Sequence, residues 1–191
     1  MEYKEHMYPA LVFATGLLVL FLSFFLDQFF VGFIDNIRNP VFTYVLNWAS
    51  YALSLVFVLL IMTSLFMWEE GKRDWIIPTW MAFFIALILT LILKVIVARE
   101  RPETYGFALL GSQYSFPSSH TAACFSLVAL LDKVYPMLKW FWVGFGVLVA
   151  FSRIYLGAHF LSDVLAGGLL GFAIGLAVVY IKEKYNLFGA G

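Results

Sequence analysis

Residues 75–102 read WIIPTWMAFFIALILTLILKVIVARERP, an apolar run that ends in a cluster of charges. A helix needs about 20 consecutive, mostly apolar residues to cross the hydrocarbon core of a bilayer, and the run from Trp75 to Ala98 is long enough. Lys94, Arg99 and Arg101 lie at the end of this run. The stretch therefore predicts a membrane-spanning helix that brings cations to one edge of the membrane.

The rest of the chain has the same apolar character. Of its 191 residues, 63% are hydrophobic and 13% are charged, and the mean hydropathy is +0.91. A soluble domain usually carries about 25% charged residues. The formal net charge of zero argues against a nucleic-acid partner. We expect a single integral membrane domain over residues 1–191, without a soluble appendage.

Apolar runs separated by polar breaks predict six spans. They cover roughly Tyr8–Leu26, Val41–Trp68, Trp75–Ala98, Ser118–Leu131, Leu138–Tyr155 and Phe160–Ile181. The first run lacks the basic leader and the cleavage site of a signal peptide, so we expect a retained helix. Between the first two spans, Phe29–Ile37 has helical periodicity, which favours a short interfacial helix over an ordinary connector. The expected fold class is all-α and polytopic, with six transmembrane helices and this interfacial helix.

The distribution of Lys and Arg gives the orientation. With six spans, one side of the membrane would hold seven of the twelve basic residues together with both termini: Lys4, Lys72, Arg73, Lys133, Lys139, Lys182 and Lys184. The other side would hold Arg38, Lys94, Arg99, Arg101 and Arg153. Setting aside three cations that a functional site would hold, the comparison becomes seven against two. Because cytoplasmic loops are rich in Lys and Arg, we expect both termini in the cytoplasm.

Alternating spans would bring several polar helix ends together on the opposite face. Lys94 and Arg101 are seven residues apart, so on a helix they would share a face, about 10 Å apart along the axis. Pro102 disfavours helical geometry at Arg101 and predicts the end of the helix there. Arg99 is interpreted as an ordinary snorkelling anchor. As a set, however, charges within a membrane tend to mark function.

Two histidines belong to the same face. His159 and Asp163 are four apart on a helix, so the carboxylate can accept from one ring nitrogen and leave the other free, as in a nucleophile held by an orienting group. Arg153 lies six residues before His159, and bringing both to one site requires a turn, for which Gly157 is the candidate. His120 opens another helix and is placed to move a proton.

The arrangement predicts a phosphate site. Ser118, Ser119 and His120 begin a helix, whose free N–H groups bind phosphate well, with Pro117 suited to the first turn. Arginine binds phosphate oxygens in bidentate fashion, and lysine acts as a point charge. Farther along, glycines recur every four residues in the last span, which favours close helix packing within the monomer over dimerisation; these are Gly167, Gly171 and Gly175.

Three motifs resemble the type 2 phosphatidic acid phosphatase superfamily of lipid phosphate phosphatases. The signature of that family is Lys, six residues, Arg-Pro; then Pro-Ser-Gly-His; then Ser-Arg, five residues, His, three residues, Asp. The chain reads KVIVARERP over residues 94–102, PSSH over residues 117–120 and SRIYLGAHFLSD over residues 152–163. Every spacing agrees. Ser119 stands where the family has glycine, which tightens the space near the phosphate but keeps the backbone N–H.

The resemblance implies a role for each residue of the motifs. His159 would attack phosphorus and form a phosphohistidine, Asp163 would orient it, and His120 would protonate the leaving oxygen and then activate water. The phosphoryl oxygens would be held by Lys94, Arg101, Ser118, Ser119 and Arg153. No cofactor is implied. The chain shows no Asp/Glu cluster with metal-ligand spacing, so we expect a metal-independent reaction.

The expected function is hydrolysis of a membrane lipid phosphate or diphosphate at the extracytoplasmic face. The candidate substrates are a polyprenyl diphosphate, phosphatidylglycerophosphate and phosphatidic acid, and both a monomer and a homodimer stay open. One alternative is transfer of the phosphoryl group to another lipid. Others are an anion transporter and an inactive lipid-phosphate-binding protein. Transport needs cations but no nucleophile with an orienting carboxylate, so the His159–Asp163 pair favours an enzyme.

Overall fold

The structure, a computed structural model, describes the backbone of residues 2–50, 52–102 and 113–188 and the side chains of residues 13–46, 56–102 and 113–188. Over these residues every regular element is a helix. They are α1 (Glu2–Ile37), α2 (Pro40–Ser50), α3 (Ala52–Glu69), η1 (Arg73–Trp75), α4 (Ile76–Val97), α5 (Ser119–Val134), η2 (Pro136–Leu138), α6 (Lys139–Tyr155) and α7 (Leu161–Tyr185). The all-α prediction is confirmed for the described part of the chain.

Four segments of the described chain are long and apolar enough to cross a membrane: Phe13–Ile37, Arg73–Val97, Pro136–Tyr155 and Leu161–Tyr185. The second expected span is divided between α2 and α3, and α5 has only 16 residues. By the length and composition of its helices, the protein is thus a multi-pass membrane protein. The total of six membrane spans stays a prediction.

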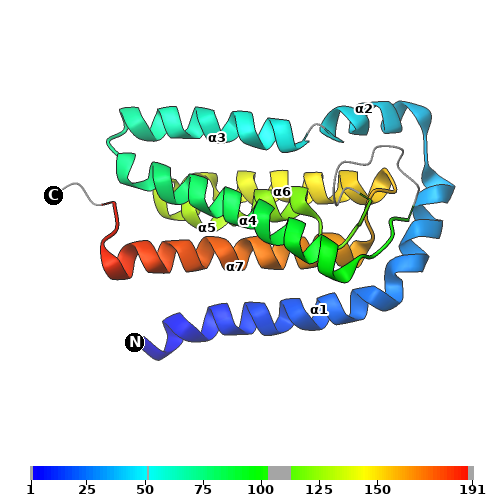
Figure 1. The fold of residues 1–191 in the computed structure, drawn as a ribbon, viewed down its shortest axis with the longest axis horizontal. Helices are drawn as coiled ribbons and strands as arrows, with labels where there is room; N and C mark the ends of the chain where they lie inside the picture. Colours follow the sequence, from blue (N-terminus) through cyan, green and yellow to red (C-terminus); the bar gives the residue numbers. More distant parts are fainter. Residues whose placement is uncertain (1, 51, 103–112, 189–191) are drawn as a thin grey trace.

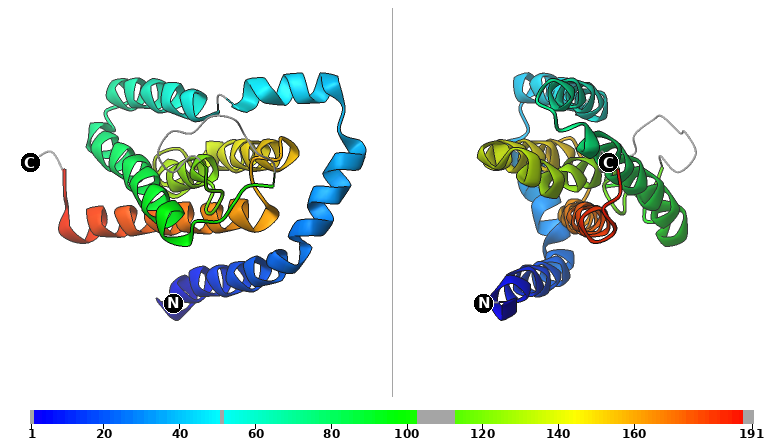
Figure 2. Two further views of the ribbon diagram at one scale, coloured as in Figure 1. Left: turned by 45° about the vertical axis from the view of Figure 1, so that its right-hand side comes forward. Right: turned by 90° about the vertical axis from the view of Figure 1, so that its left-hand side faces the viewer.

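Helices α4, α5, α6 and α7 form the body of the molecule (Figure 1). The N-terminal part of α1 runs beside this body, and its C-terminal part turns across one end of it (Figures 1 and 2). Residues 29–37 are therefore continuous with α1, whereas the sequence predicted a separate short helix. This end is anchored, because Ile34 packs with Leu46, Tyr155 and Leu156. Its place relative to a membrane surface stays a prediction.

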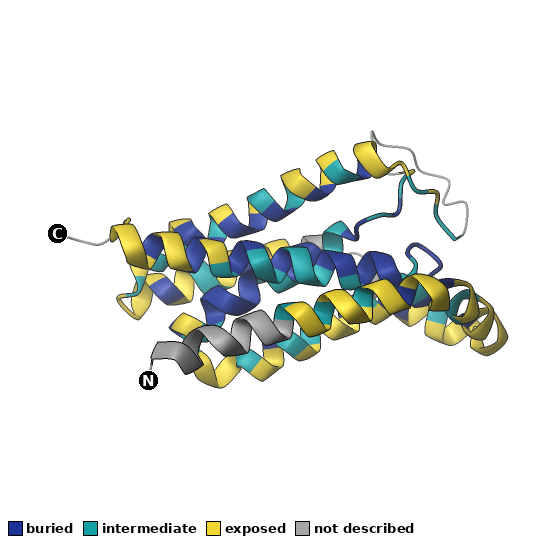
Figure 3. Cartoon of the chain, turned by 90° about the horizontal axis from the view of Figure 1, so that it is seen from below, coloured by how far each residue is buried: buried dark blue, intermediate teal, exposed yellow. Residues whose placement is uncertain are grey.

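Helix α5 lies at the centre of the bundle. It contacts α3, α4, α6 and α7, and most of its residues are buried (Figure 3). The outer helices expose large apolar side chains such as Phe25 and Ile96, as expected where lipid replaces water. The functional motif at the start of α5 is therefore carried by the helix that the other helices enclose.

The glycines of α7 set the distance between α7 and α5. A Cβ added to Gly167 would lie 2.5 Å from the carbonyl oxygen of Ser118, and one added to Gly171 or Gly175 would lie still closer to the backbone of α5. The two backbones thus touch where any other residue would hold them apart. The prediction that this stripe packs helices within the monomer is confirmed.

Candidate active site

Helix α4 ends earlier than the sequence predicted. Ala98 adopts the left-handed conformation (φ 48°) and its N–H donates to the carbonyl of Lys94, which closes the helix at Val97. A left-handed C-cap is usually glycine, so the alanine at this position gave no indication that the helix ends here. The expectation that Lys94 and Arg101 share one helix face is therefore wrong.

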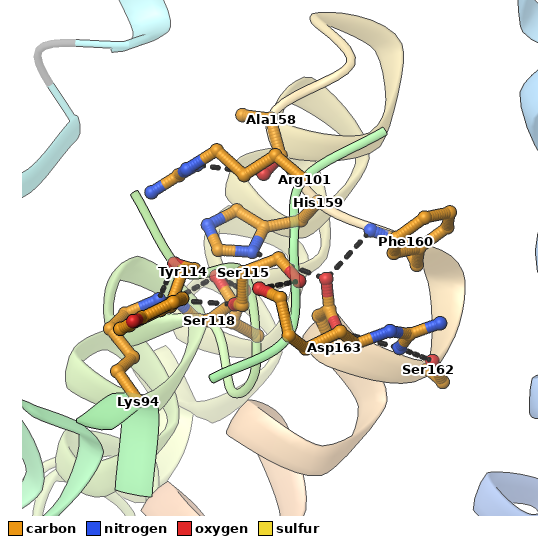
Figure 4. Close-up of polar contacts among 12 residues, drawn as sticks. Lys94, Arg101, Tyr114, Ser115, Ser118, Ala158, His159, Phe160, Ser162 and Asp163 are labelled. Atoms are coloured by element: carbon orange, nitrogen blue, oxygen red, sulfur yellow. Dashed lines mark hydrogen bonds and ion pairs between the residues drawn. The ribbon is translucent and has the colours of Figure 1, made fainter. Parts of the chain in front are cut away.

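The chain after α4 instead crosses the end of the bundle. Glu100 pairs with Tyr114 in a single antiparallel bridge, and Ser115 donates its N–H to the carbonyl of Arg99 at 2.8 Å. Lys94 extends from α4 and donates to the carbonyls of Tyr114 (2.8 Å) and Ser115 (3.0 Å). Arg101 donates to the carbonyl of Ala158 at 2.7 Å. Both cations thus reach the site from different local structures (Figure 4).

The PSSH motif forms the start of α5 as predicted. Ser118 is the N-cap, and its Oγ accepts from the backbone N–H of Thr121 at 3.4 Å and from the hydroxyl of Thr121 at 3.0 Å. Pro117 precedes the cap instead of lying in the first turn. Ser118 is fully buried, and its N–H donates to the carbonyl of Asp163 at 3.0 Å. Its contact with phosphate stays a prediction, as does that of the half-exposed Ser119.

The predicted turn between α6 and α7 is confirmed. Gly157 has a φ of 68°, a conformation that glycine adopts without a steric cost. The carbonyl of Arg153 accepts from the N–H groups of Ala158 (3.1 Å) and His159 (3.2 Å). This tight turn brings the Arg153 backbone against His159 although the two residues belong to different segments.

His159 and Asp163 lie side by side, both buried. Helix α7 begins at Leu161, so His159 precedes it and the expectation that the two residues share a helix face is wrong. The ring Nδ1 is 3.5 Å from Asp163 Oδ2, and Nδ1 makes no hydrogen bond with any of the described residues. Asp163 Oδ2 accepts instead from the backbone N–H of Phe160 at 2.8 Å, which holds the carboxylate at the start of α7. The two side chains are therefore close, as predicted, but not hydrogen-bonded. A shift of a few tenths of an ångström would bring Nδ1 and Oδ2 within hydrogen-bond distance.

Three cations surround the two histidines. Burial lowers the pKa of His159 well below its usual range, and the charges of Lys94, Arg153 and Arg101 lower that pKa further. The imidazole is therefore neutral near pH 7, the form that keeps a lone pair for attack. The same cations and His159 are close enough for their charges to act on His120. The structure thus brings together the predicted histidines, Asp163, Lys94, Arg101 and Arg153.

Two residues of this end were not predicted as part of a site. Arg99, interpreted from the sequence as a snorkelling anchor, instead donates to Asp163 Oδ1 at 2.8 Å and to Asp27 Oδ2 at 2.7 Å. Asp27, which marked a polar break, is 2% exposed within α1. The interpretation of Arg99 was wrong because its partners are distant in sequence. The sequence did contain one indication of this pairing. FFLDQFF places a carboxylate inside an apolar helix, and such a charge is costly unless it is paired.

The helical fold and the cationic histidine site agree with one known family. Residues 75–187 match the PAP2 superfamily, which is more than half of the chain. The chain belongs to the PAP2 superfamily. Helices α1, α2 and α3 lie outside the matched segment.

Individual proteins support this assignment. The chain is 30% identical over 160 residues to the bacitracin transport permease protein BcrC of Bacillus licheniformis (79% of this chain, 75% of the relative). It is 32% identical over 169 residues to phosphatidylglycerophosphatase B of Bacillus subtilis (78% of each chain). Over a shorter segment of 110 residues it is 36% identical to an undecaprenyl-diphosphatase of Sulfolobus acidocaldarius (53% of this chain, 52% of the relative).

The fold also resembles a solved structure. The crystal structure of a transmembrane PAP2-type phosphatidylglycerolphosphate phosphatase from Bacillus subtilis superposes with a TM-score of 0.69, over 90% of this chain and 96% of that one, at 24% identity. That identity supports the fold alone. Family membership and the phosphatases among the relatives make the chain a lipid phosphate phosphatase.

Proposed function

We propose that the protein hydrolyses a membrane lipid phosphate or diphosphate through a phosphohistidine on His159. The observation that carries the proposal is one buried, neutral imidazole beside Asp163, with cations from three separate segments around it. Phosphoryl transfer mainly requires positioning and neutralisation of the phosphoryl oxygens. Lys94, Arg101 and Arg153 supply that neutralisation without a metal ion.

In the first step, His159 Nε2 attacks phosphorus. The Nε2–P bond forms as the bond from phosphorus to the leaving oxygen breaks, and the electron pair goes to that oxygen. His120 enters this step protonated, since the negative charge of the bound phosphate offsets the surrounding cations, and it becomes neutral by donating that proton to the leaving oxygen. Asp163 then stabilises the positive charge that the phosphorylated ring acquires when Nδ1 keeps its proton.

In the second step, water attacks the phosphohistidine. His120, now neutral, takes a proton from the water as the new O–P bond forms. The Nε2–P bond breaks, and its electron pair returns to the ring. Inorganic phosphate leaves, and both histidines are restored to their starting states. Transfer to a lipid hydroxyl in place of water would give the phosphotransferase alternative.

The proposed substrates are a polyprenyl diphosphate, phosphatidylglycerophosphate and phosphatidic acid. The relatives named for undecaprenyl diphosphate and phosphatidylglycerophosphate support the first two. We also propose that the loop of residues 103–115 and the predicted interfacial stretch Phe29–Ile37 select headgroup and chain; most of that loop lies outside the described residues. We also propose six spans, on the apolar runs of the sequence. Cytoplasmic termini and an extracytoplasmic site are proposed on the distribution of Lys and Arg given above.

A transporter is the second candidate, since one relative is named a transport permease. A transporter needs an anion site that opens alternately to both faces. The buried His159–Asp163 pair gives the proposed site a nucleophile that transport does not need. Covalent labelling of the histidine distinguishes the two functions.

Purified protein in detergent should release phosphate from lipid phosphates and diphosphates with EDTA present. A panel covering both substrate classes would also rank the substrates. Vanadate should inhibit, because its bipyramidal adduct resembles the transition state and such analogues bind far tighter than substrates. Loss of all activity on chelation, with recovery on adding Mg²⁺, would reject the metal-independent reaction. Absence of turnover on every substrate would favour transport or binding.

The side of the membrane can be tested with single cysteines in a Cys124→Ser background. Gln113 and Glu70 are both exposed, near opposite ends of the bundle. Gln113→Cys should react with an impermeant thiol reagent on intact cells, and Glu70→Cys should react only after permeabilisation. The reverse result would place the site in the cytoplasm.

A further inference from the structure

Asp27 of α1 is joined to the proposed catalytic pair through a chain of short contacts. Its Oδ2 accepts from Arg99 at 2.7 Å and from the hydroxyl of Ser162, and its Oδ1 accepts from the N–H of Ser162 at 2.9 Å. The same guanidinium donates to Ser162 Oγ at 2.6 Å and to Asp163 Oδ1 at 2.8 Å. One arginine therefore bridges a carboxylate of α1 and the carboxylate beside His159.

This network is enclosed. The side chains of Asp27 and Asp163 are 3% and 0% exposed, and that of Arg99 is 25% exposed. The ring of Phe160 lies 4.1 Å from the guanidinium carbon, and that of Phe24 lies 5.4 Å from it. In such a low-dielectric setting each charge acts strongly on its neighbours.

The charges of the network do not cancel. Two carboxylates and one guanidinium leave a net charge of −1. Without Asp27, Arg99 and Asp163 would form a neutral pair, and the carboxylate beside His159 would favour positive charge on the imidazole less strongly. With Asp27 present, Arg99 can hold Asp163 in place while the negative charge of the group is kept.

We propose that Asp27 is a positioning residue, which balances the charge of Arg99 so that Asp163 remains fixed and negative beside His159. The inference rests on the proposed function, because it needs His159 as nucleophile. It adds that α1, which lies outside the segment that matches the family, completes the catalytic centre. Ser162 joins Asp27 to the first turn of α7 through both its N–H and its hydroxyl.

The test is a double-mutant cycle measured by rapid-quench formation of phosphoenzyme. Asp27→Asn should slow that step about 10- to 100-fold, the size expected when a supporting residue is lost or a group is misplaced by about 1 Å. Asp163→Asn should slow it more. Because Asp27 acts mainly through Asp163, the Asp27→Asn/Asp163→Asn double variant should be slower than Asp163→Asn by a clearly smaller factor than Asp27→Asn costs in the wild-type background. Independent, multiplying effects in the double variant would overturn the proposal.

Charge balance gives a second readout. The Asp27→Asn/Arg99→Met pair removes one charge of each sign and restores the net −1, so it should be faster than Asp27→Asn alone. It should also be faster and more stable than Arg99→Met alone, which leaves two carboxylates together. The comparison with Arg99→Met keeps the test decisive if Asp27→Asn is not recovered folded. A double variant slower than both single variants would overturn the charge-balance role.

The matched control is Asp74→Asn. Asp74 also pairs with a buried cation, Lys182, at 2.6 Å, but at the opposite end of the bundle. This variant should lose stability and keep its rate of phosphoenzyme formation once folded. His159→Ala, measured alongside, tests the proposed function itself. If His159→Ala still forms phosphoenzyme, the proposed function fails; if only the cycle or the charge rescue fails, the role of Asp27 alone is wrong.

Discussion

Two lysines, Lys94 and Lys182, are buried to almost the same extent at opposite ends of the bundle, 6% and 8% exposed. Lys182 lies 2.6 Å from Asp74 Oδ2, and its ammonium sits 4.2 Å from the centre of the Trp75 ring. The ammonium of Lys94 donates to two backbone carbonyls. Among the described residues no carboxylate lies within ion-pair distance of Lys94.

The difference shows how a buried charge can serve two purposes. A carboxylate neutralises the charge of Lys182, so that charge fixes η1 to the end of α7. Carbonyl dipoles solvate the charge of Lys94 but do not cancel it, and a phosphate oxygen can still be attracted to it. A buried charge without a counter-ion is costly, and here the cost falls at the end of the bundle where an anion is expected to bind.

The largest expected effects lie among the residues of the Lys94 end. His159→Ala removes the proposed nucleophile, so phosphoenzyme should disappear for every substrate and turnover should fall on the order of 10⁶-fold, as in other enzymes that lose a nucleophile. Rapid-quench trapping of acid-labile phosphohistidine measures the first result. If His159→Ala accumulates phosphoenzyme while His120→Ala abolishes it, the two roles are reversed.

His120→Ala should have a smaller effect that depends on the leaving group. General acid–base groups contribute about 10²–10⁴-fold. The loss should be greatest with phosphatidic acid, which leaves an alkoxide, and smaller with a nitrophenyl phosphate or a polyprenyl diphosphate, whose leaving groups need no proton. Steady-state rates on these substrates test the assignment. An equal loss on all of them would contradict a role as general acid.

Substitution of the two buried lysines should have opposite effects, one on activity and the other on stability. Lys94→Met should lower kcat about 10²–10³-fold, the usual cost of one group that stabilises transition-state charge, with little loss of stability. Lys182→Met leaves Asp74 without its partner and should lower the free energy of unfolding by about 2 kcal/mol, moderated because Asp74 is partly exposed. Specific activity and thermal unfolding of both variants separate the two effects. Similar profiles for the two variants would remove the distinction.

The glycines of α7 that contact the backbone of α5 can be compared with a glycine that makes no such contact. Gly171→Ala forces a methyl group into the backbone of α5 and should destabilise the protein by about 1–3 kcal/mol, as overpacking does. In the described part of the chain, no atom outside the backbone of α6 lies within 4 Å of a Cβ added to Gly144. Gly144→Ala should therefore be neutral or stabilising by up to about 1 kcal/mol. Thermal unfolding in detergent measures both, and equal stabilities would contradict the close contact of α5 and α7.

The smallest effect is a pH dependence of stability. The pKa of buried His159 is well below that of the unfolded chain, so the unfolded state binds the proton first as the pH falls through about 6.5. This group therefore destabilises the folded state on acidification, by at most about 1.4 kcal/mol per pH unit. The stability advantage of wild type over His159→Gln should shrink from pH 7 to pH 5. An advantage that is constant over this range would contradict a buried neutral ring.

The sequence was most informative where function depends on fixed spacing along one segment. The turn at Gly157 was predicted correctly, and so was the proximity of His159 and Asp163, although His159 precedes α7 and does not share a helix face with Asp163. The packing role of the glycines was also predicted correctly, because a repeat of four residues lies on one helix face. The sequence pattern failed at Ala98, because this residue ends α4 in a left-handed conformation that alanine rarely adopts. It also failed at Arg99, since no local pattern could show a partner 72 residues away on α1.

The length of α5 has a consequence for the depth at which chemistry occurs. At about 1.5 Å per residue, its 16 residues extend about 24 Å, less than the roughly 30 Å of hydrocarbon in a bilayer. Ion pairs of Asp132 with Lys139 and of Lys133 with Glu183 mark the far end of the helix as a polar boundary. A helix of this length that stood upright from that boundary would place His120 several ångströms short of the opposite surface of the hydrocarbon. At that depth a lipid phosphate would meet the histidines while its acyl or prenyl chains stayed in the bilayer.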